Sequence, residues 1–307
     1  MSDRLTNEQI YLRQSIVDIT RSFMRTRDVT ESFYDKITQG TGACENMPTA
    51  YRLATDKFAV MSQTDQLQME FDVANGIPSI YTLGRSYRNE PRTGDGRHLS
   101  EFTLLEFEAR DMDLESLLSF AEAFLRQIIR ESLESRHIPS NHKERLSKFL
   151  ETGFKRVTYT EVIQALSDRG ISINWRDDLS SRDEEAICVM YGGPVEVTYY
   201  PEKIKFFNMY RTQRDQEEET DTTTVDCVDF LLPWAGETFG GSRREESYLF
   251  MRKKLITSNM FKQMQELRKE NGFEDSPEET LKPFEQYLNI FKDKTIMRSG
   301  FGLGMGV

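Results

Sequence analysis

The stretch from Tyr81 to Arg110 carries the charged and aromatic side chains best suited to binding a nucleotide. Side chains alternate between the two faces of a strand, so Arg88 and Glu90 share one face, as do Phe102 and Glu106 on the following segment. If the two segments pair, these side chains converge on one patch. The patch would then offer a guanidinium to a phosphate, an aromatic ring to a base and carboxylates to amino groups. An ordinary salt-bridged antiparallel sheet is the alternative, although carboxylates are costly to bury beside a phenyl ring without partners.

A second group of candidate residues lies between positions 229 and 246. Asp229 and Glu237 are followed by Gly240-Gly241-Ser242 and then by Arg244. Two carboxylates suit Mg²⁺, which in proteins takes one or two carboxylates together with substrate phosphates. Glycines allow close approach of a ligand to the backbone. A plain helix cap formed by the Gly-Gly-Ser segment is the alternative.

The elements that must position these groups are helices with an apolar stripe and strands joined by hairpins. An apolar residue at every third or fourth position predicts an amphipathic helix at 7–27. The remaining pattern predicts helices at 114–135, 145–149, 159–167 and 244–267, and strands at 58–62, 79–89, 99–110, 195–200, 204–210 and 223–232. This order predicts an α+β fold with an antiparallel sheet flanked by helices.

Composition narrows the functional classes. The chain of 307 residues has a formal net charge of −11 and no basic cluster, which argues against a nucleic-acid surface and makes tRNA an unexpected partner. No run of about 18 apolar residues or signal-peptide pattern is present, so we expect no membrane span and a cytoplasmic protein. The cysteines (Cys44, Cys188 and Cys227) have neither paired nor metal-ligand spacing, so we expect reduced thiols.

The charged hairpin also resembles a known motif. Residues 87–90 (Tyr-Arg-Asn-Glu) and 97–102 (Arg-His-Leu-Ser-Glu-Phe) are similar to motif 2 of class II aminoacyl-tRNA synthetases, most of all the asparaginyl form. The resemblance implies that Arg88 holds the α-phosphate of ATP and the activated carboxylate. It further implies contacts of Glu90 with the adenine amino group, His98 with the outer phosphates, Phe102 with the adenine face, and Glu106 with the amino group of the amino acid.

The second group resembles the segment of asparaginyl-type enzymes in which Gly-Glu is followed by Gly-Gly-Ser-Gln-Arg-Glu. The resemblance implies that Asp229 and Glu237 bind Mg²⁺ and that Arg244 contacts the side-chain carboxylate or amide of the substrate. Gln66 matches the glutamine that binds the amino acid in these enzymes. Glu45 aligns with an acidic residue of a mobile loop that closes on the substrate.

Three departures from the family pattern bear on function. Motif 1 lacks its proline between positions 29 and 38, but we still expect a homodimer of the family type. Met69 stands where aspartate-specific enzymes have a lysine, which favours an amide substrate over a carboxylate. Residues 300–307 resemble motif 3 but stop at its acid–arginine pair; a flexible glycine tail is the alternative. We expect residues 1–307 to form one catalytic domain, without an anticodon-binding domain and ending within motif 3.

These observations predict an AMP-forming, ATP-dependent ligase that activates aspartate, asparagine or an analogue as an acyl-adenylate and uses ATP and Mg²⁺. With the acidic composition and the expected domain content, the favoured acceptor is ammonia or a small amine, as in asparagine synthetases of this lineage. An asparaginyl-tRNA synthetase reduced to its catalytic core and a non-catalytic regulatory paralogue are the alternatives.

Overall fold

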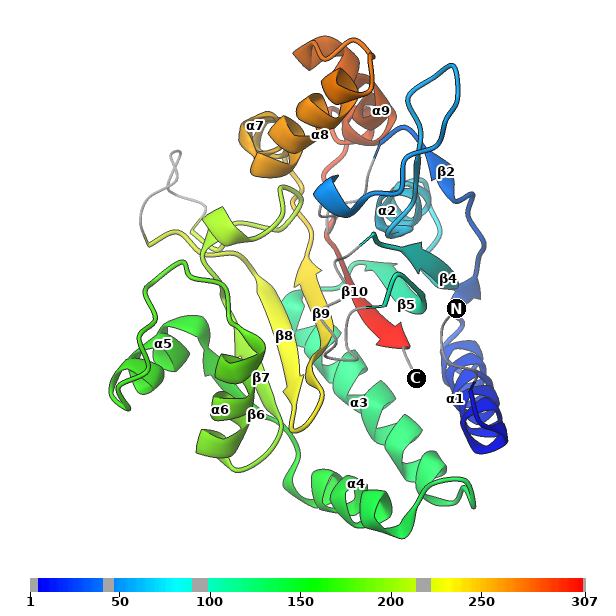
Figure 1. The fold of residues 1–307 in the computed structure, drawn as a ribbon, viewed down its shortest axis with the longest axis vertical. Helices are drawn as coiled ribbons and strands as arrows, with labels where there is room; N and C mark the ends of the chain where they lie inside the picture. The colour runs from blue at the N-terminus through cyan, green and yellow to red at the C-terminus, as the bar shows by residue number, and fades with distance from the viewer. Residues whose placement is uncertain (1–4, 41–46, 90–98, 214–221, 306–307) are drawn as a thin grey trace.

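The fold is built around one mixed sheet with helices on both faces, as seen in a computed structural model that describes residues 5–40, 47–89, 99–213 and 222–305 (Figure 1). Within those residues the sheet has the strand order β1-β4-β5-β10-β9-β8-β7-β6. Its strands are β1 (Thr30–Glu31), β4 (Ser79–Tyr87), β5 (Glu101–Arg110), β10 (Arg298–Met305), β9 (Gly236–Arg243), β8 (Cys227–Leu232), β7 (Val195–Thr198) and β6 (Lys155–Thr158). All neighbouring strands are antiparallel except the outer pairs β1–β4 and β6–β7. This confirms the predicted fold.

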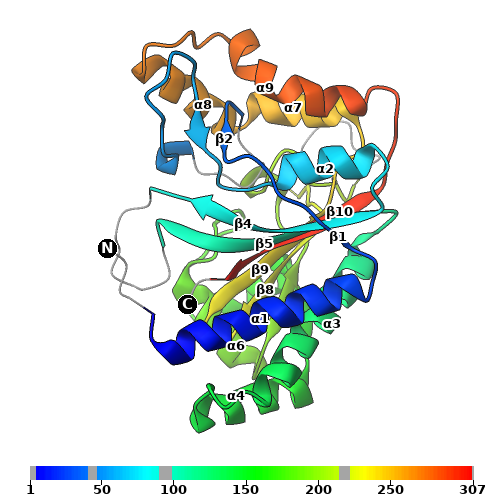
Figure 2. The same ribbon diagram turned by 90° about the vertical axis from the view of Figure 1, so that its right-hand side faces the viewer.

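One face of the sheet is covered by α1 (Asn7–Arg25) and α3 (Leu114–Leu133), which lie below the sheet in Figure 2. Phe23 of α1 and Phe124 of α3 are fully buried there against Phe107 of β5 and Phe301 of β10. Burying large aromatic side chains stabilises the fold by about 1.5–3 kcal/mol each. The aromatic core therefore fixes β5 and β10 side by side at the centre of the sheet.

The opposite face is covered by α2 (Gln66–Ala74), α7 (Tyr248–Thr257), α8 (Asn259–Glu270) and α9 (Pro277–Ile290), which lie above the sheet in Figure 2. These helices share a second apolar cluster that includes Met251, Met264, Phe284 and Leu288. A further layer around β6 to β8 is formed by α5 (Tyr159–Ser167) and α6 (Ser181–Tyr191), and α4 (Ser140–Thr152) packs on α3. The short strands β2 (Ile37–Thr38) and β3 (Val60–Met61) form a separate pair.

Two predicted elements are wrong. The predicted strand at 204–210 is a 3₁₀ turn, Glu202–Ile204, followed by irregular chain with an isolated bridge from Met209 to Arg244. The predicted helix 244–267 starts at Tyr248 and is broken at Ser258, which ends α7 and caps α8 by accepting from the Phe261 amide at 3.1 Å. A serine that bonds the following backbone favours a helix start over a helix interior.

Candidate active site

The centre of the site is the face of β5 that turns away from the aromatic core. Leu105 and Phe107 point into the core, so Glu106 and Glu108 point towards α2 and the end of β9. Glu106 is 4% exposed and accepts a hydrogen bond from the Asp65 amide at 2.7 Å and another from the Thr64 hydroxyl. Burial, reinforced by the nearby Asp65 carboxylate, raises the pKa of Glu106 to about 7. A buried carboxylate of this kind suits an ammonium group.

Next to Glu106 lies a buried group of four charged side chains, Glu70, Glu108, Arg244 and Arg298, here named the charged cluster. Arg244 Nε lies 3.1 and 3.2 Å from the two carboxylate oxygens of Glu108, and its Nη2 also donates to Glu108. Arg298 Nε donates to Glu70 Oε2 at 2.9 Å, and Arg244 Nε lies 3.7 Å from Glu70 Oε1. Burial raises the pKa of Glu108, whereas Arg244 opposes that rise. Because both Glu108 oxygens accept from Arg244, we assign the ionised form, which gives the cluster two negative and two positive charges.

Glu70 is the hub of this cluster. Its Oε1 accepts from Gln66 Nε2 at 3.0 Å and from Asn208 Nδ2 at 2.6 Å, and its Oε2 accepts from the Tyr287 hydroxyl at 2.7 Å. Gln66 and Glu70 are four residues apart on α2, so they lie on the same face of the helix. Multiple hydrogen bonds to a buried carboxylate compensate for its lost hydration. Glu70 therefore orients Gln66 while neutralising Arg298.

Glycines in β9 and β10 make room for these charges. A Cβ atom on Gly300 would lie 2.2 Å from the Glu108 carboxylate, so any larger residue at position 300 would clash with the Glu108 side chain. Gly240 to Ser242 lie within β9, and Gly300 to Gly304 lie within β10 between β5 and β9. The helix-cap and flexible-tail alternatives are therefore wrong. The glycines serve close packing at the sheet centre.

The residues predicted to bind the nucleotide, here named the nucleotide end, lie further along the same hairpin. Phe102 pairs with Ser86 across the β4–β5 ladder, and the Arg88 guanidinium lies 5.3 Å from the centre of the Phe102 ring. Arg88 Nε is buried and meets no acceptor among the described residues. A guanidinium whose Nε is buried without an acceptor, beside an aromatic face, suits a phosphate and a base. Glu90 and His98, the other predicted ATP contacts, lie outside the described residues.

Asp229 and Glu237, the predicted magnesium ligands, lie on the neighbouring strands β8 and β9, where Asp229 pairs with Gly240 and Glu237 with Leu231. A Cβ on Gly240 would lie 2.9 Å from Glu237 Oε1 and 3.6 Å from Asp229 Oδ1, so both carboxylates stand over this glycine. The neighbouring Asp229 carboxylate raises the pKa of Glu237 to about 8. Lys205 donates to Asp229 Oδ2 at 2.7 Å. The described residues include no set of three or more metal-type ligands, but two carboxylates at one point fit Mg²⁺ that is completed by phosphates and water.

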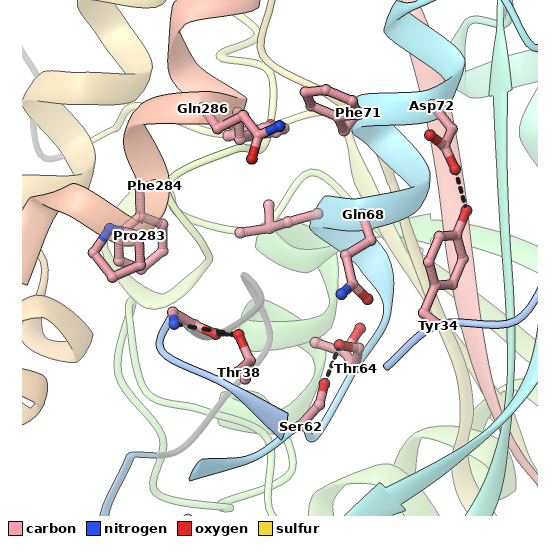
Figure 3. A pocket seen from close by; sticks show the side chains of 13 residues that line it. Tyr34, Thr38, Ser62, Thr64, Gln68, Phe71, Asp72, Pro283, Phe284 and Gln286 are labelled. Atoms are coloured by element: carbon pink, nitrogen blue, oxygen red, sulfur yellow. Dashed lines mark hydrogen bonds between the residues drawn. The ribbon is translucent and has the colours of Figure 1, made fainter. Parts of the chain in front are cut away.

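A cavity of about 400 Å³ lies between α2 and α9 (Figure 3). Its walls include Gln68 and Phe71 of α2 and Phe284 of α9. At 100° per residue these α2 side chains point away from Gln66 and Glu70. The cavity also touches Thr64 and Tyr287, which bond to Glu106 and Glu70 respectively. The cavity therefore adjoins the residues predicted to bind the amino acid, here named the amino-acid end.

The structure brings three predicted amino-acid contacts together, since Gln66 and Arg244 flank Glu70, and Glu106 lies two residues before Glu108 on β5. The fourth, Glu45, lies outside the described residues. Met69 is fully buried in an apolar cluster with Val73 and Ile80, so a preference for an amide rests on the charged cluster rather than on Met69. The residues of the site that were not predicted from the sequence include Glu70, Glu108, Asn208, Tyr287 and Arg298. Only Glu70 and Glu108 could have been found from the sequence. Glu70 lies one helical turn after Gln66, and Glu108 lies two residues after Glu106 on the same strand face.

Comparison with known proteins identifies the family of this chain. The sequence profile of the family "tRNA synthetases class II (D, K and N)" matches residues 2–306, and the chain belongs to this family. Asparagine–tRNA ligase of Pyrococcus furiosus is 31% identical over 276 residues, which make up 86% of this chain and 56% of the relative. The probable mitochondrial asparagine–tRNA ligase of Dictyostelium discoideum is 34% identical over 235 residues, covering 73% of this chain and 46% of the relative. The chain thus spans about half the length of these curated relatives.

Solved structures give the same result. Asparaginyl-tRNA synthetase from Pyrococcus horikoshii, complexed with asparaginyl-adenylate, superposes with a TM-score of 0.76 at 28% identity, over 96% of this chain and 62% of that one. A putative aspartyl-tRNA synthetase from Leishmania major, at 17% identity and a TM-score of 0.71, shows the same fold.

Among the described residues, every helix is too short or too polar to span a lipid bilayer.

Proposed function

We propose that this chain catalyses the ATP-dependent activation of asparagine as asparaginyl-adenylate. The observation that carries the proposal is the charged cluster between Gln66, Glu106 and the end of β9. Its two carboxylates and two guanidiniums leave no net charge. An aspartate side chain would add an uncompensated buried charge there, whereas a carboxamide adds none. The similarity to asparagine–tRNA ligases supports the same substrate.

The roles of the residues follow from the positions of their charges. The Glu106 carboxylate binds the α-ammonium group of asparagine, which leaves the α-carboxylate directed along β5 towards Phe102 and Arg88. An oxygen of that carboxylate attacks the α-phosphorus of ATP, a new O–P bond forms, and the bond to the bridging oxygen breaks as pyrophosphate leaves. Arg88 neutralises the charge that spreads over the α-phosphate in the transition state. Phe102 stacks on the adenine ring.

Asp229 and Glu237 would hold Mg²⁺, which when bound supplies positive charge to the phosphate oxygens. Lys205 holds Asp229 in place beside Gly240. Because Lys205 is itself a cation, it limits the repulsion between the two carboxylates before ATP arrives.

The acceptor of the activated acyl group is a separate question. Transfer to ammonia or a small amine, which the composition favoured, has no support among the relatives. We propose instead that the activated asparagine passes to tRNA, as the names of the relatives imply for those proteins. The net charge of −11 describes the whole chain and does not prevent a local basic surface.

Isotope exchange between ATP and pyrophosphate tests the first half of the proposal. Purified protein with Mg²⁺ is supplied with asparagine or with aspartate alone. We expect exchange that depends on asparagine and is at least tenfold weaker with aspartate. Exchange with neither amino acid would overturn the activity, and exchange with aspartate alone would overturn the substrate.

Charging of tRNA with labelled asparagine tests the second half, with ammonia and hydroxylamine as competing acceptors. Acid-precipitable asparaginyl-tRNA supports transfer to RNA. Formation of the free amide or hydroxamate at the same rate with and without tRNA would favour the amine acceptor.

A further inference from the structure

Asn208 has an unusual environment for a fully buried amide. It lies in the irregular segment after the 3₁₀ turn and has no solvent exposure. Its backbone carbonyl oxygen accepts a hydrogen bond from the backbone amide of Glu245 at 2.7 Å, which fixes the backbone of Asn208 beside Arg244. Its side-chain Nδ2 donates to Glu70 Oε1 at 2.6 Å. Asn208 is therefore held between the two ends of the charged cluster.

The orientation of this amide is determined by its neighbour. Glu70 Oε1 is a carboxylate oxygen and can only accept, so the Asn208 nitrogen must face it; a flipped amide would place two acceptors together. Oδ1 of Asn208 is then directed away from Glu70. No donor among the described residues reaches Oδ1, although the atom is buried. A buried acceptor without a partner costs about 1–3 kcal/mol.

We propose that Asn208 determines side-chain specificity, and that Oδ1 accepts a hydrogen bond from the carboxamide NH₂ of the bound asparagine. This inference rests on the proposed asparagine activation. Asparagine offers two N–H donors at the end of its side chain, whereas an aspartate carboxylate offers only acceptors and would repel Oδ1. Guanidinium donors of the cluster would satisfy the carbonyl oxygen of the carboxamide. The charged cluster thus disfavours a charged substrate side chain, and Asn208 favours a neutral side chain that carries an NH₂ donor.

Discrimination by a buried group that is left unpaired with the wrong substrate is stronger than discrimination by shape. Glu70 retains Gln66, Tyr287 and Arg298 as donors when Asn208 is replaced, so the cluster keeps most of its hydrogen bonds. Replacement of Asn208 by leucine removes the acceptor with little change in volume. The change therefore tests specificity more than folding.

The experiment compares wild-type protein with Asn208→Leu in ATP–pyrophosphate exchange. We expect kcat/KM for asparagine to fall about 10–100-fold, mostly through KM, because one buried hydrogen bond is lost. For aspartate, measured as kcat/KM or as Ki against asparagine, we expect a change of less than about threefold or a gain, because a repulsive contact is removed. The ratio of the two values is the result that matters, since a general structural defect lowers both together.

Two further variants keep the test decisive. Thr280→Val removes a fully buried hydroxyl that also lacks a partner among the described residues but lies on α9 outside the site, and it must leave the ratio unchanged. If Asn208→Leu unfolds, Asn208→Ala must still lower the asparagine-to-aspartate ratio. An unchanged ratio in a folded Asn208 variant overturns the inference and leaves the proposed function standing. Failure of the wild-type protein with asparagine instead overturns the proposed function.

Discussion

The two ends of the candidate site differ in how far they are organised before any ligand binds. At the amino-acid end, Glu70 accepts from Gln66, Asn208, Tyr287 and Arg298 and is fully buried. At the nucleotide end, Arg88 is only partly buried, and its Nε meets no acceptor among the described residues. A site of the first kind selects by rejecting ligands that leave its charges unbalanced. A site of the second kind gains its partner from the ligand itself, as phosphate binding requires.

This comparison predicts that substitutions at the amino-acid end mainly lower the free energy of unfolding, whereas substitutions at the nucleotide end mainly lower the rate of amino-acid activation. The largest effect is expected from Glu70→Ala, which leaves Arg298 buried without its carboxylate. We expect the free energy of unfolding to fall by about 3–5 kcal/mol, as measured by denaturant titration.

A matched control is available on the surface. Arg85 and Glu101 form an ion pair at 2.7 Å with side chains 41% and 50% exposed. We expect Arg85→Ala to cost at most about 1 kcal/mol, because water screens such pairs. Equal losses for the two variants would contradict the contrast between a buried and an exposed ion pair.

The second prediction concerns the nucleotide end. We expect Arg88→Ala to lower kcat for pyrophosphate exchange about 100–1000-fold, because the developing phosphate charge loses its fixed counter-charge. Unfolding stability should change by less than about 1 kcal/mol, since the side chain is not fully buried.

Arg88→Lys separates charge from geometry. Lysine keeps the positive charge but lacks the planar fork, so we expect an activity between those of the wild type and the alanine variant. A large loss of stability in either Arg88 variant would show that the two ends of the site do not divide their roles as we describe.

The same contrast explains what could be predicted from the sequence. The nucleotide end comes from one hairpin, so strand alternation and a family motif were enough to place Arg88 beside Phe102. The charged cluster joins residues as distant as Glu70 and Arg298, 228 positions apart. Neither the helical period of α9 nor the strand at the end of the chain indicates that these elements meet over α2. Such contacts depend on the packing of the whole sheet, which local patterns do not encode.

Segments between regular elements were a second source of error. The apolar run at 204–210 has a strand-like composition, but Asn208 and Met209 bond individually to the chain after β9 rather than along a ladder. Asn208 could not be singled out from the sequence because nothing in its neighbourhood marks a buried amide. The orientation of the Asn208 amide is determined by the Glu70 carboxylate, which only the folded structure brings close to it.

The third prediction tests whether the neutral cluster sets substrate choice. Glu108→Gln removes one negative charge and leaves the cluster with a net positive charge beside the substrate. We expect the ratio of kcat/KM for aspartate to that for asparagine to rise about tenfold, equivalent to about 1.4 kcal/mol. Pyrophosphate exchange with each amino acid measures the ratio.

A buried carboxylate that pairs with a partly exposed arginine provides the control for this change. Glu196 on β7 is 2% exposed and pairs with Arg156 at 2.8 Å, outside the candidate site. Glu196→Gln should lower stability without altering the ratio. A rise in the aspartate ratio in both variants, or in neither, would argue against the charge of the cluster as the basis of selection.

The smallest effect is expected from pH, and it tests Glu106. Because burial and the Asp65 carboxylate raise the pKa of Glu106 to about 7, the side chain is mostly neutral at pH 6 and mostly ionised at pH 7.5. The ionised form attracts the ammonium group of the substrate, so KM for asparagine should fall as pH rises, by about eightfold over this interval. Glu106→Gln cannot ionise, so its KM should be higher and nearly independent of pH. A flat wild-type profile would mean that Glu106 is already ionised at pH 6 or does not contact the substrate, and a sloping profile in the glutamine variant would assign the titration to another group.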